Sequence, residues 1–332
     1  MKKNKQVILK KRSNLEILES NFEVVDAEIP PINVGEFLIR AHYLSVDPYM
    51  RGRIDEEKSY AEKVEIGEVM VGTVVGMVVE SSHDKFLVGD FVEARTGWQL
   101  YGICNGSGIR KLKNDGVPLT ANLGTVGMPG VTAWIGLNVH AQPIKGETVV
   151  VSAASGAVGS VVGQLSKLKG CRVIGIAGGH TKCDYVVNEL GFDACLNYKD
   201  KDFQKNLRDT CNEGVDVYFD NVGGIILDSI LNYMNPFSRI VLCGQISGYS
   251  DPSALTVHNF RSFLINRIQL KGFICSDHMD LWRLALSELG DLVKSGQLKY
   301  KESIAIGLDS APKALIGLME GKNFGKQLVK LI

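Results

Sequence analysis

Hydrophobic residues in the first third of the chain occur in short runs with the alternation of β-strands. This pattern predicts strands at 6–9, 22–27, 36–44, 69–80 and 91–94. Turns rich in Gly, Pro and Asp separate these runs, as at Pro30-Pro31 and Gly89-Asp90. Short strands at irregular spacing with turns between them are typical of a partly open antiparallel barrel.

From about residue 123 the pattern changes, because short apolar runs now alternate with segments of helical periodicity. The predicted strands are 148–152, 172–177, 194–197, 215–220, 239–242 and 268–273, and helices are predicted at 131–139, 157–168, 182–190, 203–211, 225–234 and 281–295. Strands that alternate with helices indicate an α/β domain with a doubly wound parallel sheet.

After these helices, residues 301–308 have a β pattern again, and a last helix and strand follow. We expect this tail to return to the first domain, so that the doubly wound domain is an insertion. The predicted organisation is a first domain at 1–122, a second at 123–297, and the returning tail at 298–332. A length of 332 residues suits two domains.

Charge and composition exclude several classes of protein. Lys plus Arg and Asp plus Glu are both 37, so no overall field favours nucleic acid or an anionic membrane. The longest apolar run, 69–79, is interrupted by glycines and is far shorter than the roughly 20 residues of a membrane-spanning helix. The basic N-terminus lacks the apolar region of a signal peptide, and we expect a cytoplasmic protein.

The seven cysteines contain no C-x-x-C pair, and their odd number and scatter favour free thiols in a reducing compartment. The six histidines show no H-E-x-x-H spacing. We therefore predict no metal site.

The strongest motif lies at 147–163, ETVVVSAASGAVGSVVG, where a buried strand passes through small residues into a helix. The first turn of a helix offers unpaired N–H groups and the positive end of the helix dipole to a diphosphate. Gly156, Gly159 and Gly163 permit close approach of the backbone and tight packing of the helix on its strand. The motif favours a dinucleotide site; the alternative is a small-residue turn without a ligand.

The next strand indicates which dinucleotide is bound. It ends in AGGHTK (177–182), where an NAD-binding protein has an Asp or Glu for the ribose 2′-hydroxyl. No carboxylate stands there to repel a 2′-phosphate, and Lys182 supplies a cation. We infer NADP(H) as the cofactor, the alternative being that Lys182 is only a solvated charge.

Six stretches together resemble the medium-chain dehydrogenase/reductase superfamily. Within it, the chain is similar to the zinc-free group of leukotriene B4 12-hydroxydehydrogenase/prostaglandin reductases and alkenal double-bond reductases. The stretches are SVDPYMRGR (45–53), GMPGVTAW (127–134), SAASGAVGSVVGQ (152–164), FDNVGG (219–224), CGQISGY (243–249) and GKNFGK (321–326). The resemblance implies a Rossmann domain inserted into a GroES-like barrel, and it implies a homodimer that continues the nucleotide-domain sheet through an edge strand at 268–273.

Zinc-dependent members of that superfamily have a Gly-His-Glu stretch and a lobe with four cysteines. Here Gly67-Glu68 lacks the histidine and no cysteine cluster exists, so metal-assisted alcohol oxidation lacks its Lewis acid. The departure favours reduction of an activated carbon–carbon double bond.

Carried over position by position, the resemblance implies a set of cofactor contacts along the chain. They are Gly156, Ala157, Val158 and Gly159 at the diphosphate, Lys182 and Tyr198 at the 2′-phosphate, Asn221 beside the cofactor, Cys243, Gly244, Gln245, Ile246, Ser247 and Tyr249 with Phe273, Ile274 and Cys275 at the nicotinamide, and Asn323 from the tail.

Tyr249 is the candidate catalytic residue. Hydride addition to the β-carbon of an enone places negative charge on the carbonyl oxygen, and a phenol O–H directed at that oxygen stabilises the enolate. The α-carbon proton comes from Tyr249, from water or from the ribose hydroxyl, since a phenol with a pKa near 10 is a weak acid. The alternative is that Tyr249 only packs in a turn with Gly248.

Tyr49 is either a wall of the substrate pocket or a packing residue of the barrel. Trp98 and Tyr101 are better explained as structural aromatics, and Arg51 and Arg53 as charges that anchor a loop. Cys243 has no activating histidine beside it in sequence, so we do not assign it as a nucleophile.

The sequence thus predicts NADPH-dependent reduction of α,β-unsaturated ketones or aldehydes. Three alternatives remain open: an NADPH quinone reductase, oxidation of a hydroxyl on a lipid mediator, and a non-catalytic NADPH-binding protein.

Overall fold

The computed structural model describes all residues except 1–2, 14–15, 57–58 and 250. The chain forms two compact units. Unit 1 comprises Met1–Gly124, Glu302–Asn323 and Gln327–Ile332, and unit 2 comprises Thr125–Lys301 and Phe324–Lys326. The tail expected to return to the first domain is therefore divided, since its residues 298–301 and 324–326 belong to unit 2.

Unit 2 contains a six-stranded sheet in the order β10-β9-β8-β11-β12-β13, and neighbouring strands are parallel. The order reverses between β8 and β11, and ligands of open α/β sheets bind at such a switch point. The bounds are β8 Thr148–Ser152, β9 Arg172–Ala177, β10 Ala194–Asn197, β11 Val215–Asp220, β12 Met234–Leu242 and β13 Gln269–Gly272. The predicted Rossmann arrangement is confirmed.

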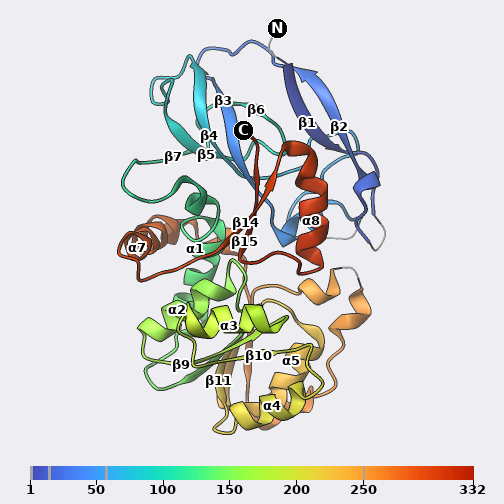
Figure 1. The fold of residues 1–332 in the computed structure, drawn as a ribbon, viewed down its shortest axis with the longest axis vertical. Helices are drawn as coiled ribbons and strands as arrows, with labels where there is room; N and C mark the ends of the chain where they lie inside the picture. Colours follow the sequence, from blue (N-terminus) through green and yellow to red (C-terminus); the bar gives the residue numbers. More distant parts are fainter. Residues whose placement is uncertain (1–2, 14–15, 57–58, 250) are drawn as a thin grey trace. The chain divides into compact units, whose positions relative to one another are not determined.

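Alternate side chains of these strands point to opposite faces, and each face is covered by helices (Figure 1). Val149 and Val151 of β8 join one core with residues of α1, α2, α3 and α7. Val150 joins a second core with residues of α4 and α5. The bounds are α1 Met128–Ile135, α2 Gly159–Leu168, α3 His180–Asn188, α4 Phe203–Thr210, α5 Gly224–Ile230, α6 Arg261–Ile265 and α7 Trp282–Lys294.

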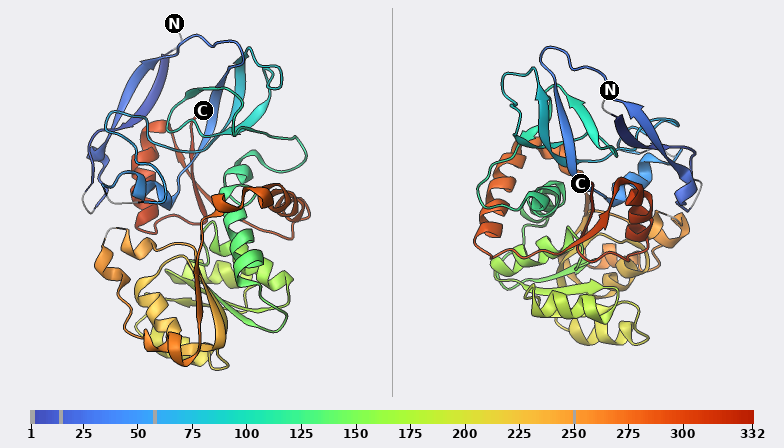
Figure 2. Two further views of the ribbon diagram at one scale, coloured as in Figure 1. Left: turned by 180° about the vertical axis from the view of Figure 1, so that it is seen from behind. Right: turned by 45° about the horizontal axis from the view of Figure 1, so that its top comes forward.

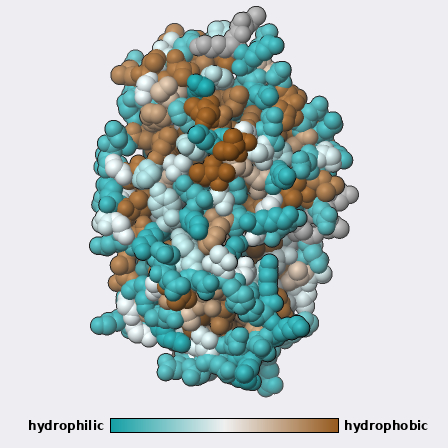
Figure 3. Space-filling view, viewed as in Figure 1, coloured by the Kyte–Doolittle hydropathy of each residue, from teal (hydrophilic) through white to brown (hydrophobic). Residues whose placement is uncertain are grey.

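Charged and amide residues of α4 face outward, and hydrophilic residues gather over this part of unit 2 in Figure 3. Phe203 and Leu207 point inward from the same helix, so that α4 has one apolar and one polar face. In the described part of the chain, no helix is both long enough and apolar enough to cross a membrane.

Unit 1 is an antiparallel structure around one large apolar core. A seven-stranded sheet has the order β14-β15-β3-β4-β5-β7, with β6 also paired to β3, and β1 pairs with β2. Helix α8 packs beside the N-terminal segments (red and blue in Figure 2). The bounds are β1 Lys3–Leu9, β2 Phe22–Glu28, β3 Phe37–Ser45, β4 Val74–Ser81, β5 Phe91–Ala94, β6 Tyr101–Cys104, β7 Arg110–Lys111, α8 Ala311–Met319, β14 Glu302–Ile306 and β15 Lys326–Lys330.

Several predicted elements have different bounds in the structure. The strand predicted at 69–80 begins only at Val74, because the preceding backbone bonds elsewhere, as from Met70 N to Val7 O. The helix predicted at 131–139 ends as an α-helix at Ile135 and continues as a π-helical turn, Gly136–Ala141. Strand β12 begins at Met234 rather than 239, and β6 and β7 were not predicted.

Candidate active site

The predicted diphosphate site is the turn from β8 into α2. Gly156 N donates to Ala153 O at 2.8 Å, and Ala153 adopts a positive φ of 49°. A Cβ on Gly156 would stand 3.1 Å from the Ala153 carbonyl oxygen, so the turn is tight at this glycine. Helix α2 begins at Gly159 without a side-chain cap, and the positive end of its dipole favours an anion.

The other two glycines of the motif serve packing. A Cβ on Gly159 would collide with the Ala153 carbonyl, and one on Gly163 would collide with the Phe192 ring. At Gly156 a Cβ would be less obstructed, at 3.1 Å from the same carbonyl oxygen.

At the switch point, the ends of β8 and β11 are joined by side chains. Ser152 Oγ donates to Asp220 Oδ1 at 3.0 Å and accepts from Asn221 N at 2.8 Å. Asn221 Nδ2 donates to Ser152 O at 2.8 Å. These bonds fix Asn221, a predicted cofactor contact, at the carboxyl end of the sheet.

Asp220 is the centre of this network and was not predicted from the sequence. Its Oδ1 also accepts from Tyr218 OH at 2.8 Å, Val222 N at 3.0 Å and Gly223 N at 2.9 Å, whereas the buried Oδ2 has no hydrogen-bond partner in the described part of the chain. Burial raises the pKa of Asp220, although these donors oppose the rise. A charged residue that ends a buried strand was the signal that could have identified it.

The backbone of Asp220 also places the predicted nicotinamide loop. Cys243 N and Gly244 N donate to Asp220 O at 2.8 and 3.1 Å. The loop continues through a short 3-10 turn, Ile246–Gly248, to Tyr249, whose N donates to Ile246 O at 3.4 Å. Tyr249 is half-buried in unit 2.

Burial raises the pKa of the Cys243 thiol well above its usual range, and Cys275 and Asp220 add to this effect. A thiol with a raised pKa is protonated near neutral pH and is a poor nucleophile. The structure thus agrees with leaving Cys243 out of the chemistry.

Phe273, Ile274 and Cys275 follow the edge strand β13 and are half-buried. The Phe273 ring lies 6.5 Å from the Phe219 ring and 5.0 Å from the His140 ring, between centroids. Sequence reasoning did not identify His140, which belongs to the π-helical turn Gly136–Ala141.

The two predicted 2′-phosphate residues follow adjacent strands, Tyr198 directly after β10 and Lys182 in the helix after β9. Tyr198 follows β10, and a Cβ on Gly178 would be 3.0 Å from its ring, so the ring lies against the glycine backbone. Lys182 lies in the first turn of α3 and is half-buried. Burial, and then the charge of Lys199, lower the pKa of Lys182.

The tail contacts the predicted diphosphate site directly. Gly325 forms an isolated parallel bridge with Gly156. Beside it, the Lys301 ammonium lies 4.0 Å from the centroid of the Phe324 ring, which meets the Tyr185 ring edge-on at 5.0 Å. Asn323, the predicted tail contact, precedes this segment and belongs to unit 1.

Buried Gln164 attaches the outgoing chain to α2, and it is a further residue that the sequence reasoning did not use. Its side chain accepts from Lys299 N and donates to Lys299 O, both at 2.8 Å. Two parts of the tail, at Lys299 and at Gly325, are therefore held on unit 2.

Tyr49 belongs to unit 1, in the 3-10 turn Pro48–Arg53. Burial and the charge of Asp47 raise its pKa above the usual range of a phenol. The guanidinium carbon of Arg53 lies 5.6 Å from the centre of the Tyr49 ring.

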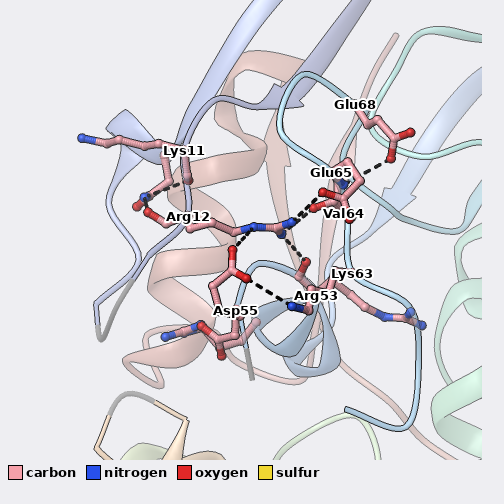
Figure 4. Close-up of polar contacts among 11 residues, drawn as sticks. Lys11, Arg12, Arg53, Asp55, Lys63, Val64, Glu65 and Glu68 are labelled. Carbon is pink, nitrogen blue, oxygen red and sulfur yellow. Dashed lines mark hydrogen bonds and ion pairs between the residues drawn. The ribbon is translucent and has the colours of Figure 1, made fainter. Parts of the chain in front are cut away.

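Residues after this turn contact the half-buried side chain of Arg12 (Figure 4). Arg12 pairs with Glu56 at 3.0 Å and with Glu65 at 3.1 Å, and it donates to the carbonyl of Val64. These bonds brace the chain that follows Tyr49 and Arg53.

The other aromatic and charged candidates of unit 1 have structural surroundings. Trp98 is fully buried, and its ring stacks on Phe22 at 5.4 Å. Arg51 is buried and pairs with Asp55. Across the described ranges, no group of three or more His, Cys, Asp or Glu is placed to hold a metal ion.

Two family models match the chain, one described as the N-terminal domain of oxidoreductase over residues 5–112 and one as zinc-binding dehydrogenase over residues 157–291. The chain is 41% identical to NADPH-dependent curcumin reductase of Escherichia coli, over 99% of this chain and 97% of the relative. It is 41% identical to the NADP(+)-dependent 2-alkenal reductase of Nicotiana tabacum, over 98% and 97%.

Prostaglandin reductase 1 of Rattus norvegicus is 42% identical over 94% of each chain. The structure is also similar to that of CurA from Vibrio vulnificus in complex with NADPH, with a TM-score of 0.94, 44% identity and 99% of both chains covered.

Proposed function

Because this chain belongs to the zinc-free medium-chain dehydrogenase/reductases that include prostaglandin reductase 1 and 2-alkenal reductase, we propose how its residues serve that chemistry. It is an NADP-dependent oxidoreductase that reduces the carbon–carbon double bond of α,β-unsaturated ketones and aldehydes. Which member of that substrate class it uses is decided by the acceptor pocket.

The bound dinucleotide supplies the hydride. The cradle at Gly156, Ala157, Val158 and Gly159 holds the diphosphate at the N-terminus of α2, which has no side-chain cap. Lys182 and Tyr198 hold the 2′-phosphate. Asn221, the loop Cys243, Gly244, Gln245, Ile246, Ser247 and Tyr249, the segment Phe273, Ile274 and Cys275, and Asn323 complete the cofactor site.

Tyr249 stabilises the enolate. Its phenol donates a hydrogen bond to the acceptor's carbonyl oxygen as negative charge develops there. The loop that carries Tyr249 is fixed through Cys243 N and Gly244 N to the backbone of Asp220. A donor that is positioned in advance loses little free energy to reorganisation during the reaction.

Tyr49 forms a wall of the acceptor pocket. A phenol is neutral at physiological pH, so this wall presents an aromatic surface without charge. A neutral aromatic wall suits an apolar enone or alkenal.

The proposal is supported above all by the hydrogen bonds among Ser152, Asp220 and Asn221 at the switch point. These bonds fix the ends of β8 and β11, and the Asp220 carbonyl also fixes the 243–249 loop, so that the proposed cofactor contacts are held together. Steady-state oxidation of NADPH, and separately of NADH, with enones, alkenals, quinones and simple ketones tests it. We expect rapid turnover of enones and alkenals with NADPH and little with NADH. Turnover of quinones alone would replace the proposal with a quinone reductase, and bound NADPH without turnover would leave a binding protein.

We also propose a homodimer that continues the parallel sheet through β13. This strand is at the edge of the sheet, and all four of its residues are exposed. Leu270 on it is 48% exposed and Leu264 on the preceding helix α6 is 79% exposed, which is a surface that a second copy would cover. The seven free cysteines support a reducing compartment, and we place the protein in the cytoplasm.

A further inference from the structure

A second lysine lies beside the predicted 2′-phosphate residues. Lys199 directly follows Tyr198 and is exposed, and its ammonium lies 5.9 Å from the centroid of the Tyr198 ring. An ammonium at this distance is attracted by the ring face. The ring of Tyr198 therefore keeps the Lys199 ammonium close to itself.

The backbone that carries Lys199 is tied to the start of α3. The Asn197 side-chain oxygen accepts from Gly179 N at 2.7 Å and from Lys199 N at 3.2 Å. Asn197 is buried, with 9% exposed. One fixed amide thus sets the chain at Lys199 next to the helix turn that contains Lys182.

After burial, the charge of Lys199 contributes to the lowered pKa of Lys182. The nearby carboxylate of Asp200 is engaged, because it accepts from Asn197 Nδ2 at 2.6 Å and lies 3.3 Å from the His180 ring nitrogen. Across the described ranges, no carboxylate lies within ion-pair distance of Lys199. Two neighbouring like charges repel each other, and an anion bound beside both relieves that repulsion.

We propose that Lys199 binds the 2′-phosphate of NADPH together with Lys182, and that this second cation contributes to discrimination against NADH. A phosphate with nearly two negative charges matches two ammonium groups better than one. Because Lys199 is exposed, its contribution is screened by salt. The inference depends on NADPH as the cofactor and is independent of Tyr249 and of the acceptor.

The test is a binding titration without acceptor, with NADPH, NADH, and the half-ligands adenosine 2′,5′-bisphosphate and 5′-AMP. We expect Lys199→Met to weaken NADPH and the bisphosphate by about tenfold and to change NADH and 5′-AMP less than about twofold. Lys199→Arg should restore most of the loss. Lys201→Met, which removes an exposed lysine two residues away, is the matched control and should leave all four affinities unchanged.

Salt provides a second readout. The affinity of the wild type for the bisphosphate should fall more steeply with salt than that of Lys199→Met, because one ion contact is missing in the variant. Unchanged NADPH and bisphosphate affinities in Lys199→Met would overturn the proposal. Equal weakening of all four ligands would overturn it as well, since that result indicates a general disturbance of the site.

Discussion

Ser152 and Asp220 link the two central strands of the parallel sheet, with 3.0 Å between Ser152 Oγ and Asp220 Oδ1. Their strands, β8 and β11, are the pair at which the strand order reverses. The same carboxyl oxygen accepts three further bonds, and the Asp220 carbonyl accepts from the loop that leads to Tyr249. Asp220 thus positions the backbone around the predicted cofactor site through both its side chain and its carbonyl group.

Two substitutions of Asp220 distinguish its role as a hydrogen-bond acceptor from the effect of its charge. Asp220→Ala leaves two hydroxyls and two backbone N–H groups without their acceptor, and we expect a loss of roughly 3 kcal/mol in the free energy of unfolding. Asp220→Asn keeps an oxygen for these donors and places its NH₂ where Oδ2 has no partner, so its loss should be much smaller. Denaturant unfolding measures both, and equal losses would contradict the assignment.

The raised pKa of Asp220 sets the direction in which the free energy of unfolding changes with pH. The pKa of Asp220 is raised in the folded protein, so the folded state binds the proton more tightly than the unfolded state. Ionisation therefore costs stability as pH rises from the unfolded pKa, about 3.9, to the raised folded value. Asp220→Asn cannot ionise, so unfolding of both proteins across pH should show the wild type losing stability relative to the variant in that window. A difference independent of pH would contradict this.

Tyr249→Phe tests the enolate donor. Removing the hydroxyl should lower kcat for enones by about 10²-fold, the usual effect of losing one oxyanion donor. NADPH affinity should change little. Tyr233→Phe, elsewhere in unit 2, is the matched control and should retain full activity. Undiminished enone turnover in Tyr249→Phe would remove the assigned role.

Two glycines of the tail have the same type of backbone conformation but different surroundings, so their substitutions can be compared. Gly325 has a φ of 72° and Gly321 a φ of 68°. A Cβ at 325 would collide with the Lys301 carbonyl, whereas one at 321 meets nothing within 4 Å. Gly321→Ala should cost about 1 kcal/mol of stability from backbone strain.

Gly325→Ala should cost at least about 2 kcal/mol more, because a collision with backbone adds to that strain. It should also weaken NADPH binding, since Gly325 bridges to Gly156 of the cradle. Thermal unfolding and NADPH titration of both variants measure these effects. Equal behaviour of the two variants would show that the tail does not support the cradle.

The edge strand β13 provides a test of assembly. Leu270→Glu places a charge on an exposed strand and should shift the protein from dimer to monomer in sedimentation velocity. Val34→Glu, at a position that is 96% exposed in unit 1, should leave the assembly unchanged. A wild type that is monomeric at micromolar concentration would exclude the dimer.

Apolar periodicity located the regular elements of unit 2 because a buried parallel strand has a strong signature. The bounds of β8, β9, β10 and β11 agree with the sequence prediction. The predicted bounds agree less well with the structure where tertiary contacts determine the end of an element. Helix α1, for example, passes into a π-helical turn at Gly136, where a Cβ would collide with the Phe219 and Phe273 rings. Strands β6 and β7 are short, and their pattern is too weak to identify them.

The sequence by itself determined the alternation of strands and helices, the glycine turn before α2, and the absence of a carboxylate after β9, because each is a local property of consecutive residues. Tertiary structure alone decided which distant residues meet. It joined Asp220 to Ser152, Gln164 to Lys299, and Gly325 to Gly156. Such contacts depend on strand order and on where the tail returns, and neither is encoded in the periodicity of any one segment.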